Sequence, residues 1–385
     1  MDYVELGVPF PQLSASHDNK KIAYIDIETT GFMSDNNHIY LIGLAIIKNK
    51  KPYFMYLFAK DTDEEKGILI KLMVFIKDYN LLIHFNGLTF DIPFIEKRCQ
   101  FHGIRCELKT YDQLDLYKII YSKKKYLNIN GYKQKDIELA LGINREDIYN
   151  GRELIRLYHA YQSMLALTSD NAKNEADNLF DTLLKHNYED IKYLVKISHI
   201  LDLKTLYTED IIHDCIVKDG ILELSCRCDY TDSSVISEYI NLFNKSFLGI
   251  KDIALDSDGE IHISVNIFSG ELKMFFENYK DYYYLPVEDC AIHKSVARYV
   301  DADYRVNATK DTCYIKKNGD FIALNLSNKD LCKRIKKLCE NENVKLFSHK
   351  RNDQTVYILV EANAGEVMLS KVCYILLSTL LDYLI

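Results

Sequence analysis

The sequence predicts an α/β domain, built on a mixed sheet with helices on both faces, followed by a separate α+β domain. Two observations predict the first domain: its first three strand-like segments follow one another through short connections, and the later ones alternate with helices. A third observation predicts the second domain, because the chain has 385 residues and changes beyond Lys204 to alternating strands. We therefore expect an N-terminal extension over residues 1–20 and domains over residues 21–203 and 204–385.

Five segments rich in apolar, β-branched and aromatic residues predict the strands of the first sheet. The first segment ends before Gly31, and the next two follow it as antiparallel neighbours. The last two alternate with helices, which predicts the parallel part of a mixed five-stranded sheet. The expected strands are residues 21–30, 38–47, 53–58, 81–85 and 105–109.

Apolar residues at helical spacing predict the helices of the first domain. Thr62 followed by Glu65 matches a capping box before the first helix. Pro93 suits the first turn of the second helix, and Gly103 suits its end. Further helices are expected at residues 112–121 and 176–201.

The second domain is expected to combine strands with three helices. Asn318 and Gly319 form a dipeptide that favours a two-residue hairpin turn. The expected strands are residues 221–230, 260–268, 271–276, 313–317 and 321–324, and the expected helices are residues 288–299, 329–339 and 366–384.

The composition argues against several classes of protein. A net charge of −8 argues against indiscriminate coating of nucleic acid, because that affinity comes from lysine and arginine, but it leaves a local basic groove open. Ten cysteines without a Cys-x-x-Cys pair support neither a zinc site nor a disulfide framework, so we expect reduced thiols in a cytoplasmic protein. The N-terminus lacks the pattern of a secretory signal, and the apolar stretch 372–385 is too short to span a membrane.

Two carboxylates near the end of the first strand are the strongest sign of chemistry. Asp26 and Glu28 are two residues apart, so in a strand their side chains point to the same face. Two like charges at that distance repel, and a hard divalent cation between them allows both to stay ionised. Oxygen ligands favour Mg²⁺ or Mn²⁺. The alternative is a solvent-facing strand end with two ordinary carboxylates.

Two further acids are candidates for the same site. Asp91 lies where a buried strand leads into a helix, and its alternative role is that of a helix N-cap. Asp190 lies in the apolar stripe of the last helix, and its alternative is a solvated carboxylate at the edge of that stripe.

The order of these acids resembles the DEDD superfamily of 3′-to-5′ exonucleases, which have the ribonuclease H-like fold. The segments Asp26–Gly31, Asn86–Asp91 and His186–Asp190 are similar to its three motifs. Within the superfamily the chain is most similar to bacterial YprB-like proteins, whose helical signature resembles residues 132–138 and 141–147 with Gly151. The resemblance covers about residues 21–203.

The resemblance implies two bound Mg²⁺ or Mn²⁺ ions and a nucleic-acid substrate, most simply a single-stranded 3′ end. It implies that Asp26 bridges both ions, that Glu28 and Asp190 hold the ion that activates water, and that Asp91 supports the other. Two ions about 4 Å apart activate the nucleophile, neutralise charge and stabilise the leaving oxygen. The substrate-binding residues implied are Thr29, Thr30, Gly31, Asn86 and Phe90.

The residue that assists the water departs from the family pattern. One subclass has a tyrosine four residues before the last aspartate, and this chain has His186 there, with Tyr188 only two residues before Asp190. Because residues i and i+4 share a helix face, His186 is better placed to reach the metal site. It suits a general base, and the alternative is that it packs or hydrogen-bonds a carboxylate.

The function expected from these residues is a metal-dependent 3′-to-5′ exonuclease of DNA or RNA. The alternatives are a ribonuclease H-type endonuclease and a catalytically silent nucleic-acid-binding adaptor. Polymerase proofreading within this chain is disfavoured, because no room remains for a polymerase palm.

Basic and aromatic residues near the motifs suggest a path for a phosphate backbone and for stacked bases. An ordinary solvated surface is the alternative for each of them. The basic residues are Lys123, Lys124, Lys125, Lys133, Lys135, Arg145, Arg152 and Arg156, and the aromatic ones are Tyr121, Tyr126 and Tyr132. In the second domain, an auxiliary nucleic-acid contact is one hypothesis for the basic residues His293, Lys294, Arg298, Arg305, Lys333, Arg334, Lys336 and Lys337.

Overall fold

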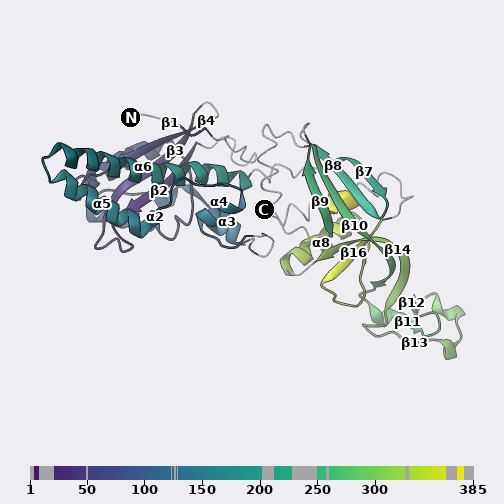
Figure 1. Ribbon diagram of the computed structural model, residues 1–385. Helices are drawn as coiled ribbons and strands as arrows, with labels where there is room; N and C mark the ends of the chain where they lie inside the picture. Colours follow the sequence, from purple (N-terminus) through teal and green to yellow (C-terminus); the bar gives the residue numbers. More distant parts are fainter. Residues whose placement is uncertain are drawn as a thin grey trace. The chain divides into compact units, whose positions relative to one another are not determined.

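The computed structural model divides into two compact units, Met1–Thr205 and Leu206–Leu384 (Figure 1). None of the helices in the described residues combines the length and the apolar character needed to cross a membrane. The structure describes residues 4–7, 21–48, 51–122, 124, 127, 129–201, 212–227, 249–256, 260–325, 329–360 and 371–376.

The first unit is built on a mixed sheet in the order β1-β4-β3-β2-β5-β6. The strand β2 lies near its centre, antiparallel to β3 and parallel to β5. Its residues alternate between the two faces of the sheet, so successive side chains meet different layers of helices. The strands are β1 Val4–Glu5, β2 Ile22–Thr29, β3 Ile39–Lys48, β4 Lys51–Phe58, β5 Leu81–His84 and β6 Asp112–Asp115.

Helices cover both faces of this sheet. One face packs against α1 and α2 through a core that includes Ile25, Leu69 and Ile95. The other face packs against α5 and α6, which lie side by side (Figure 1). The helices are α1 Glu65–Phe75, α2 Asp91–Phe101, α3 Leu116–Ser122, α4 Gln134–Ala140, α5 Gly151–Leu165 and α6 Asp170–Ile197.

The predicted mixed sheet with helices on both faces is confirmed, with two corrections. It has six strands and not five, because β1 from the expected N-terminal extension pairs with β4. The predicted strand at residues 105–109 and the start of the helix at residue 112 are wrong. A short 3₁₀ helix, η2 Leu108–Thr110, precedes β6, which pairs in parallel with β5. This pairing overrides the weak strand propensity of the sequence Asp-Gln-Leu-Asp.

The predicted capping box at the start of α1 is also wrong. The N-cap position is Glu64, and no side chain caps it. Glu65 instead turns into the protein, where its carboxylate accepts hydrogen bonds from the Ile39 backbone N–H at 2.8 Å and from Arg98 Nη2 at 2.6 Å. A buried ion pair therefore fixes the start of α1 to α2 and β3.

The second unit is an α+β assembly of antiparallel strands. Its larger sheet has the order β15-β16-β14-β10-β8-β7, with β9 also paired to β10, and its smaller sheet has the order β12-β11-β13. The strands are β7 Ile212–Lys218, β8 Ile221–Arg227, β9 Ile250–Leu255, β10 Glu260–Phe275, β11 Tyr282–Leu285, β12 Cys290–His293, β13 Val306–Asn307, β14 Tyr314–Asn325, β15 Leu346–Phe347 and β16 Thr355–Val360. The helical parts are α8 Lys329–Asn341, residues 371–376 and the 3₁₀ helices η6 Tyr279–Asp281, η7 Ala297–Tyr299 and η8 Ala302–Tyr304.

Three predictions for the second unit need correction. The hairpin turn at Asn318 and Gly319 is wrong, because both residues lie inside the continuous strand β14. The two strands expected at 260–268 and 271–276 are likewise one strand, β10, which pairs with β14 along its second half. The helix expected at 288–299 is instead β12 followed by η7. The helix expected at 366–384 is described only at residues 371–376, and its other residues lie outside the described part.

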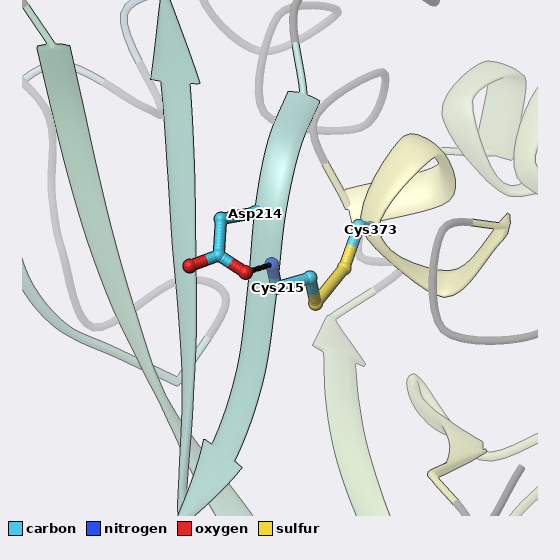
Figure 2. Close-up of a disulfide and its surroundings, with 3 residues drawn as sticks. All are labelled: Asp214, Cys215 and Cys373. Carbon is cyan, nitrogen blue, oxygen red and sulfur yellow. Dashed lines mark hydrogen bonds between the residues drawn. A yellow bond between two sulfur atoms is a disulfide. The ribbon is translucent and has the colours of Figure 1, made fainter. Parts of the chain in front are cut away.

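One disulfide links two distant parts of the second unit. Cys215 in β7 is bonded to Cys373 in the helical segment 371–376 (Figure 2). The two residues are 158 positions apart, so no local spacing in the sequence indicates the pairing. The expectation of reduced thiols is therefore wrong for this pair. Six further cysteines are free, namely Cys99, Cys106, Cys290, Cys313, Cys332 and Cys339.

Candidate metal centre

Asp26 and Glu28 lie on the face of β2 that is covered by α6. The Nδ2 atom of Asn187 in α6 donates a hydrogen bond to Asp26 Oδ2 at 2.9 Å. The Nε2 atom of His186 lies 3.5 Å from Glu28 Oε1. Because both carboxylates meet the same helix, the shared face predicted from their spacing is confirmed, and the solvent-facing alternative is wrong.

Asp91 reaches the same strand from α2. Its side chain is buried, and its Oδ1 atom accepts a hydrogen bond from the backbone N–H of Ile27 at 3.1 Å. The N-cap of α2 is Phe90, so the alternative role of Asp91 as an N-cap is wrong. This contact holds the Asp91 carboxylate at the stretch of β2 that carries Asp26 and Glu28.

Asp190 and His186 complete the cluster from α6. They are four residues apart on one helix face, and His186 Nε2 lies 3.0 Å from Asp190 Oδ2. Ligand atoms of Glu28, His186 and Asp190 all lie within 4.8 Å of one another. The Asp190 side chain is only 17% exposed, so the alternative of a solvated helix-edge carboxylate is wrong.

A glycine in β3 lets α6 approach the acids closely. Gly43 is the cross-strand partner of Asp26, and a Cβ atom at this position would collide with the side chain of Asn187. Asn187 is fully buried and donates to Asp26. A glycine inside a strand marks such a close approach, and here it makes room for the residue that holds Asp26.

Burial and the mutual repulsion of the carboxylates disfavour their ionised forms when no cation is bound. Burial and the nearby carboxylates of Asp190, Asp91 and Glu28 raise the pKa of Asp26 well above its ordinary value. Burial raises the pKa of Glu28 to about 7, with Asp190 adding to the effect and His186 opposing it. Burial also raises the pKa of Asp91 to about 7. A divalent cation would relieve this repulsion and favour the ionised carboxylates.

His186 is a charged hydrogen-bond donor in this cluster. Its Nδ1 atom lies 2.6 Å from Asp147 Oδ2, and its Nε2 atom faces Asp190 and Glu28. Burial opposes its protonation, but the carboxylates of Asp190, Asp147 and Glu28 outweigh burial and raise the pKa of His186 to about 11. Without a bound cation, these contacts favour the doubly protonated imidazole.

Tyr188 lies apart from the acids. Its ring meets Phe54 of β4 edge to face, with 5.2 Å between the ring centroids. Residues i and i+2 point to different sides of a helix. Of the two residues considered as helpers, His186 is the one that the structure brings to the cluster.

Several residues of the cluster's surroundings were missed in the sequence. Arg145 bridges the Glu138 carboxylate and Asp190, with its Nη1 atom 2.5 Å from Asp190 Oδ1. Its side chain is only 6% exposed, so the expectation that it contacts phosphate is wrong. Gln134 Nε2 donates to the Asp190 backbone carbonyl at 2.8 Å. Gln134, Arg145 and Asp147 lie in the helical signature, which was the available signal, but only Arg145 had an expected role, and that role was a phosphate contact.

The predicted substrate-binding residues lie at the end of β2, in the loop that follows it and at the start of α2. Thr29 Oγ1 donates to the Gly31 carbonyl at 2.9 Å, and Thr30 Oγ1 accepts from the His38 backbone N–H at 3.1 Å. Both hydroxyls thus shape the loop after β2. Phe90 begins α2, and its ring packs on Phe94 with 5.5 Å between centroids.

Asn86 stands at a tight turn between β5 and α2. Its φ of 59° is in the left-handed region, which asparagine tolerates better than most residues. Asp115 at the end of β6 accepts its backbone N–H at 2.8 Å and that of Leu88 at 3.3 Å. Asp115, also missed in the sequence, therefore holds the turn that leads to Asp91.

A pocket of about 520 Å³ opens beside two of the acids. Its wall combines carboxylates from β2 and α6 with aromatic, amide and cationic groups from the segment after β5, from α3 and from the start of α4. The lining residues are Asp26, Phe85, Asn86, Tyr117, Tyr132, Lys133, Gln134 and Asp190.

The donor set of the cluster fits a hard divalent cation. Asp26, Glu28, Asp91 and Asp190 offer carboxylate oxygens only, which is the ligand type of Mg²⁺ and Mn²⁺. The cluster also opens to a pocket, as a site that exchanges substrate requires.

One family model matches the first unit of the chain. No curated protein matches the chain significantly. Among solved structures the chain is similar to the family B DNA polymerase from the hyperthermophilic archaeon Pyrobaculum calidifontis, with 9% sequence identity and a TM-score of 0.38. That match covers 94% of this chain and 46% of the polymerase chain, so the chain spans less than half of the polymerase's length. Residues 23–201 match the RNase_H_2 family model of the RNase_H superfamily, and together with the sheet topology this match identifies the first unit as an RNase H-like domain.

Proposed function

We propose that the first unit is a metal-dependent nuclease that acts as a 3′-to-5′ exonuclease on DNA or RNA. The observation that carries the proposal is the convergence of Asp26, Glu28, Asp91 and Asp190 from β2, α2 and α6 on one buried position. An RNase H-like fold supports a nucleic-acid substrate. Burial of four carboxylates together costs stability, and such costly clusters are typical of functional sites.

The four carboxylates have distinct roles in this proposal. Asp26 would be shared between two ions, Glu28 and Asp190 would hold one of them, and Asp91 would support the other. When bound, the ions activate the attacking water, neutralise the charge of the phosphoryl group and stabilise the leaving oxygen. Asn187 and the Ile27 backbone N–H hold Asp26 and Asp91 in place.

The substrate in this proposal is a single-stranded 3′ end. Thr29, Thr30, Gly31 and Phe90 would border the terminal nucleotide, and Asn86 would contact it from the pocket. Nucleic-acid contact by the second unit and a cytoplasmic location stay predictions.

The test is cleavage of 5′-labelled single-stranded DNA and RNA in Mg²⁺ or Mn²⁺, beside the Asp26→Ala variant. We expect a ladder that shortens from the 3′ end with the wild-type protein and no ladder with the variant. Internal cuts in RNA–DNA hybrids would instead favour the ribonuclease H-type endonuclease. Binding without any cleavage would favour the silent adaptor and contradict the proposal.

We expect His186 to position Asp190 and Glu28 and not to act as a general base, because its two ring nitrogens already face Asp147 and Asp190. The His186→Ala variant should lose about 10- to 100-fold in rate, because both carboxylates lose the imidazole that pairs with them. Asp147→Asn should lose about 10-fold or more, since Asp147 orients the imidazole. The measurement is the pH–rate profile of each variant. A profile whose acidic limb disappears with His186→Ala would contradict the positioning role and favour a general base.

A further inference from the structure

We propose that the pocket beside Asp26 and Asp190 is a nucleobase site, in which an unpaired base stacks on Tyr117 and Tyr132. The inference rests on the proposed nuclease function and names its substrate class, a strand that is single-stranded at the cleaved end. The pocket wall belongs to a continuous set of rings, which we call the aromatic wall: Phe85, Tyr117, Tyr121 and Tyr132.

The aromatic wall is assembled from three separate segments. The centroids of Phe85 and Tyr117 are 5.8 Å apart, and those of Tyr117 and Tyr121 in α3 are 5.4 Å apart with the rings nearly parallel. Tyr121 then meets Tyr132, just before α4, edge to face at 5.2 Å. One edge of this set borders the acids, so a base on the wall would lie next to the phosphate at the metal centre.

The wall is only partly buried, in contrast to the aromatic rings of the core. Tyr24, Tyr40 and Tyr158 are fully buried, whereas Tyr121 is 40% exposed and Tyr117 and Tyr132 are half-buried in the pocket lining. If these rings only completed the core, their faces would be buried like those of the core tyrosines and would not be exposed to a pocket. Exposed aromatic faces beside a phosphate site are what sequence-tolerant base stacking uses.

Cationic groups hold the wall and add the charge that a nucleotide needs. Lys124 Nζ lies 4.2 Å from the Tyr121 ring centroid and 2.9 Å from its hydroxyl oxygen. The Tyr132 hydroxyl donates to the Lys124 carbonyl at 3.1 Å. Lys133 is exposed and lines the pocket itself. The rim is therefore basic, and the pocket floor is acidic where the ions that bind phosphate would lie.

The size of the pocket suits one nucleotide and not a duplex end. Its volume of about 520 Å³ lies in the range of small-ligand sites. A base within a duplex is already stacked and paired, so it must first leave the helix, which costs a few kcal/mol. Asn86 adds an amide to the same lining, where it can contact the edge of a base.

The experiment compares a short single strand with the same strand carrying an abasic 3′ nucleotide. Affinity is measured by fluorescence anisotropy in Ca²⁺, and kcat/KM is measured in Mg²⁺. We expect the wild-type protein to prefer the normal strand by about 10-fold in both measurements. Tyr117→Ala and Tyr132→Ala should lose about 10-fold on the normal strand and little on the abasic strand. Tyr117→Phe retains the ring and should restore most of the preference that Tyr117→Ala loses.

The matched control is Tyr56→Ala, because Tyr56 is a comparably exposed tyrosine, at 38%, on β4. Equal values for the normal and abasic strands, or full retention by both alanine variants, would overturn the base site while the nuclease function stands. If no strand is cleaved, the nuclease function fails, and the anisotropy comparison alone still decides whether the pocket binds a base.

Discussion

The Asp26→Asn variant is expected to lose phosphodiester cleavage by about 1,000-fold or more and yet to melt at a higher temperature than the wild-type protein in EDTA. The loss follows because Asp26 is the acid shared between the two proposed ions. The gain follows because burial and three neighbouring carboxylates raise the pKa of Asp26, so its ionised form is unfavourable in the metal-free fold. Asparagine removes the charge and keeps an oxygen for the Asn187 donor.

The gain should appear as a rise in melting temperature near neutral pH, at about 3 °C for each kcal/mol in a domain of this size. The pKa of Asp26 is raised in the folded protein, so folding favours its neutral form. The stability of the wild-type protein is therefore fully present below pH 3.8, the ordinary pKa, and falls as the pH rises above it. The difference between variant and wild type should therefore be small near pH 4 and grow toward neutral pH. Thermal unfolding followed at several pH values checks this trend.

Metal addition should make the wild-type protein melt at a higher temperature than the Asp26→Asn variant. Mg²⁺ or Mn²⁺ binds the folded wild-type protein and should raise its melting temperature, while the variant should respond weakly. The control is Asp181→Asn, because Asp181 lies in α6 but is exposed. An equal metal response in wild type and Asp26→Asn would contradict a metal centre that depends on Asp26.

Local spacing explains how much of the site could be predicted from the sequence. The i, i+2 relation of Asp26 and Glu28 and the i, i+4 relation of His186 and Asp190 are properties of a strand and a helix, so they hold whatever the rest of the fold is. Arg145 could not be assigned in this way. Arg145 lies between α4 and α5 and its partner Asp190 is in α6, so only packing shows that the guanidinium is buried against a carboxylate.

The fold, like the site, could be predicted from local patterns but not where long-range contacts decide the structure. The first sheet could be predicted because its strands are apolar and its connections are short. The Asn318-Gly319 pair favours a hairpin locally, but β14 continues through it because its residues pair with β10 on one edge and β16 on the other. Gly319 lies opposite Gly270 in that ladder. Long-range pairing therefore decides what a strong local turn signal leaves open.

The Arg98→Met variant is expected to destabilise the first unit by about 3–5 kcal/mol, the usual cost of removing one partner of a buried ion pair. Glu65 is fully buried, and Arg98 is 4% exposed. Arg98 donates to Glu65 through Nε at 2.9 Å and through Nη2 at 2.6 Å, and its Nη1 donates to the Ser34 carbonyl at 3.1 Å. His102 Nε2 lies 2.6 Å from the same carboxylate. Methionine fills much of the volume but leaves Glu65 with the imidazole as its one remaining side-chain partner among these residues.

A double-mutant cycle separates the lost ion pair from lost packing. In Arg98→Met with Glu65→Gln, the buried charge is gone, so the double variant should be more stable than Arg98→Met alone. The control is Lys97→Met, whose side chain is 58% exposed and which should change stability by less than about 0.5 kcal/mol. Urea unfolding of the full chain gives the free energies, and amide exchange in α1 and α2 assigns them to the first unit. Two results would contradict this expectation: a loss below about 1 kcal/mol for Arg98→Met, or a double variant that is less stable than either single variant. Either result would show that the Glu65 carboxylate does not depend on this guanidinium. The start of α1 would then owe its position to packing alone.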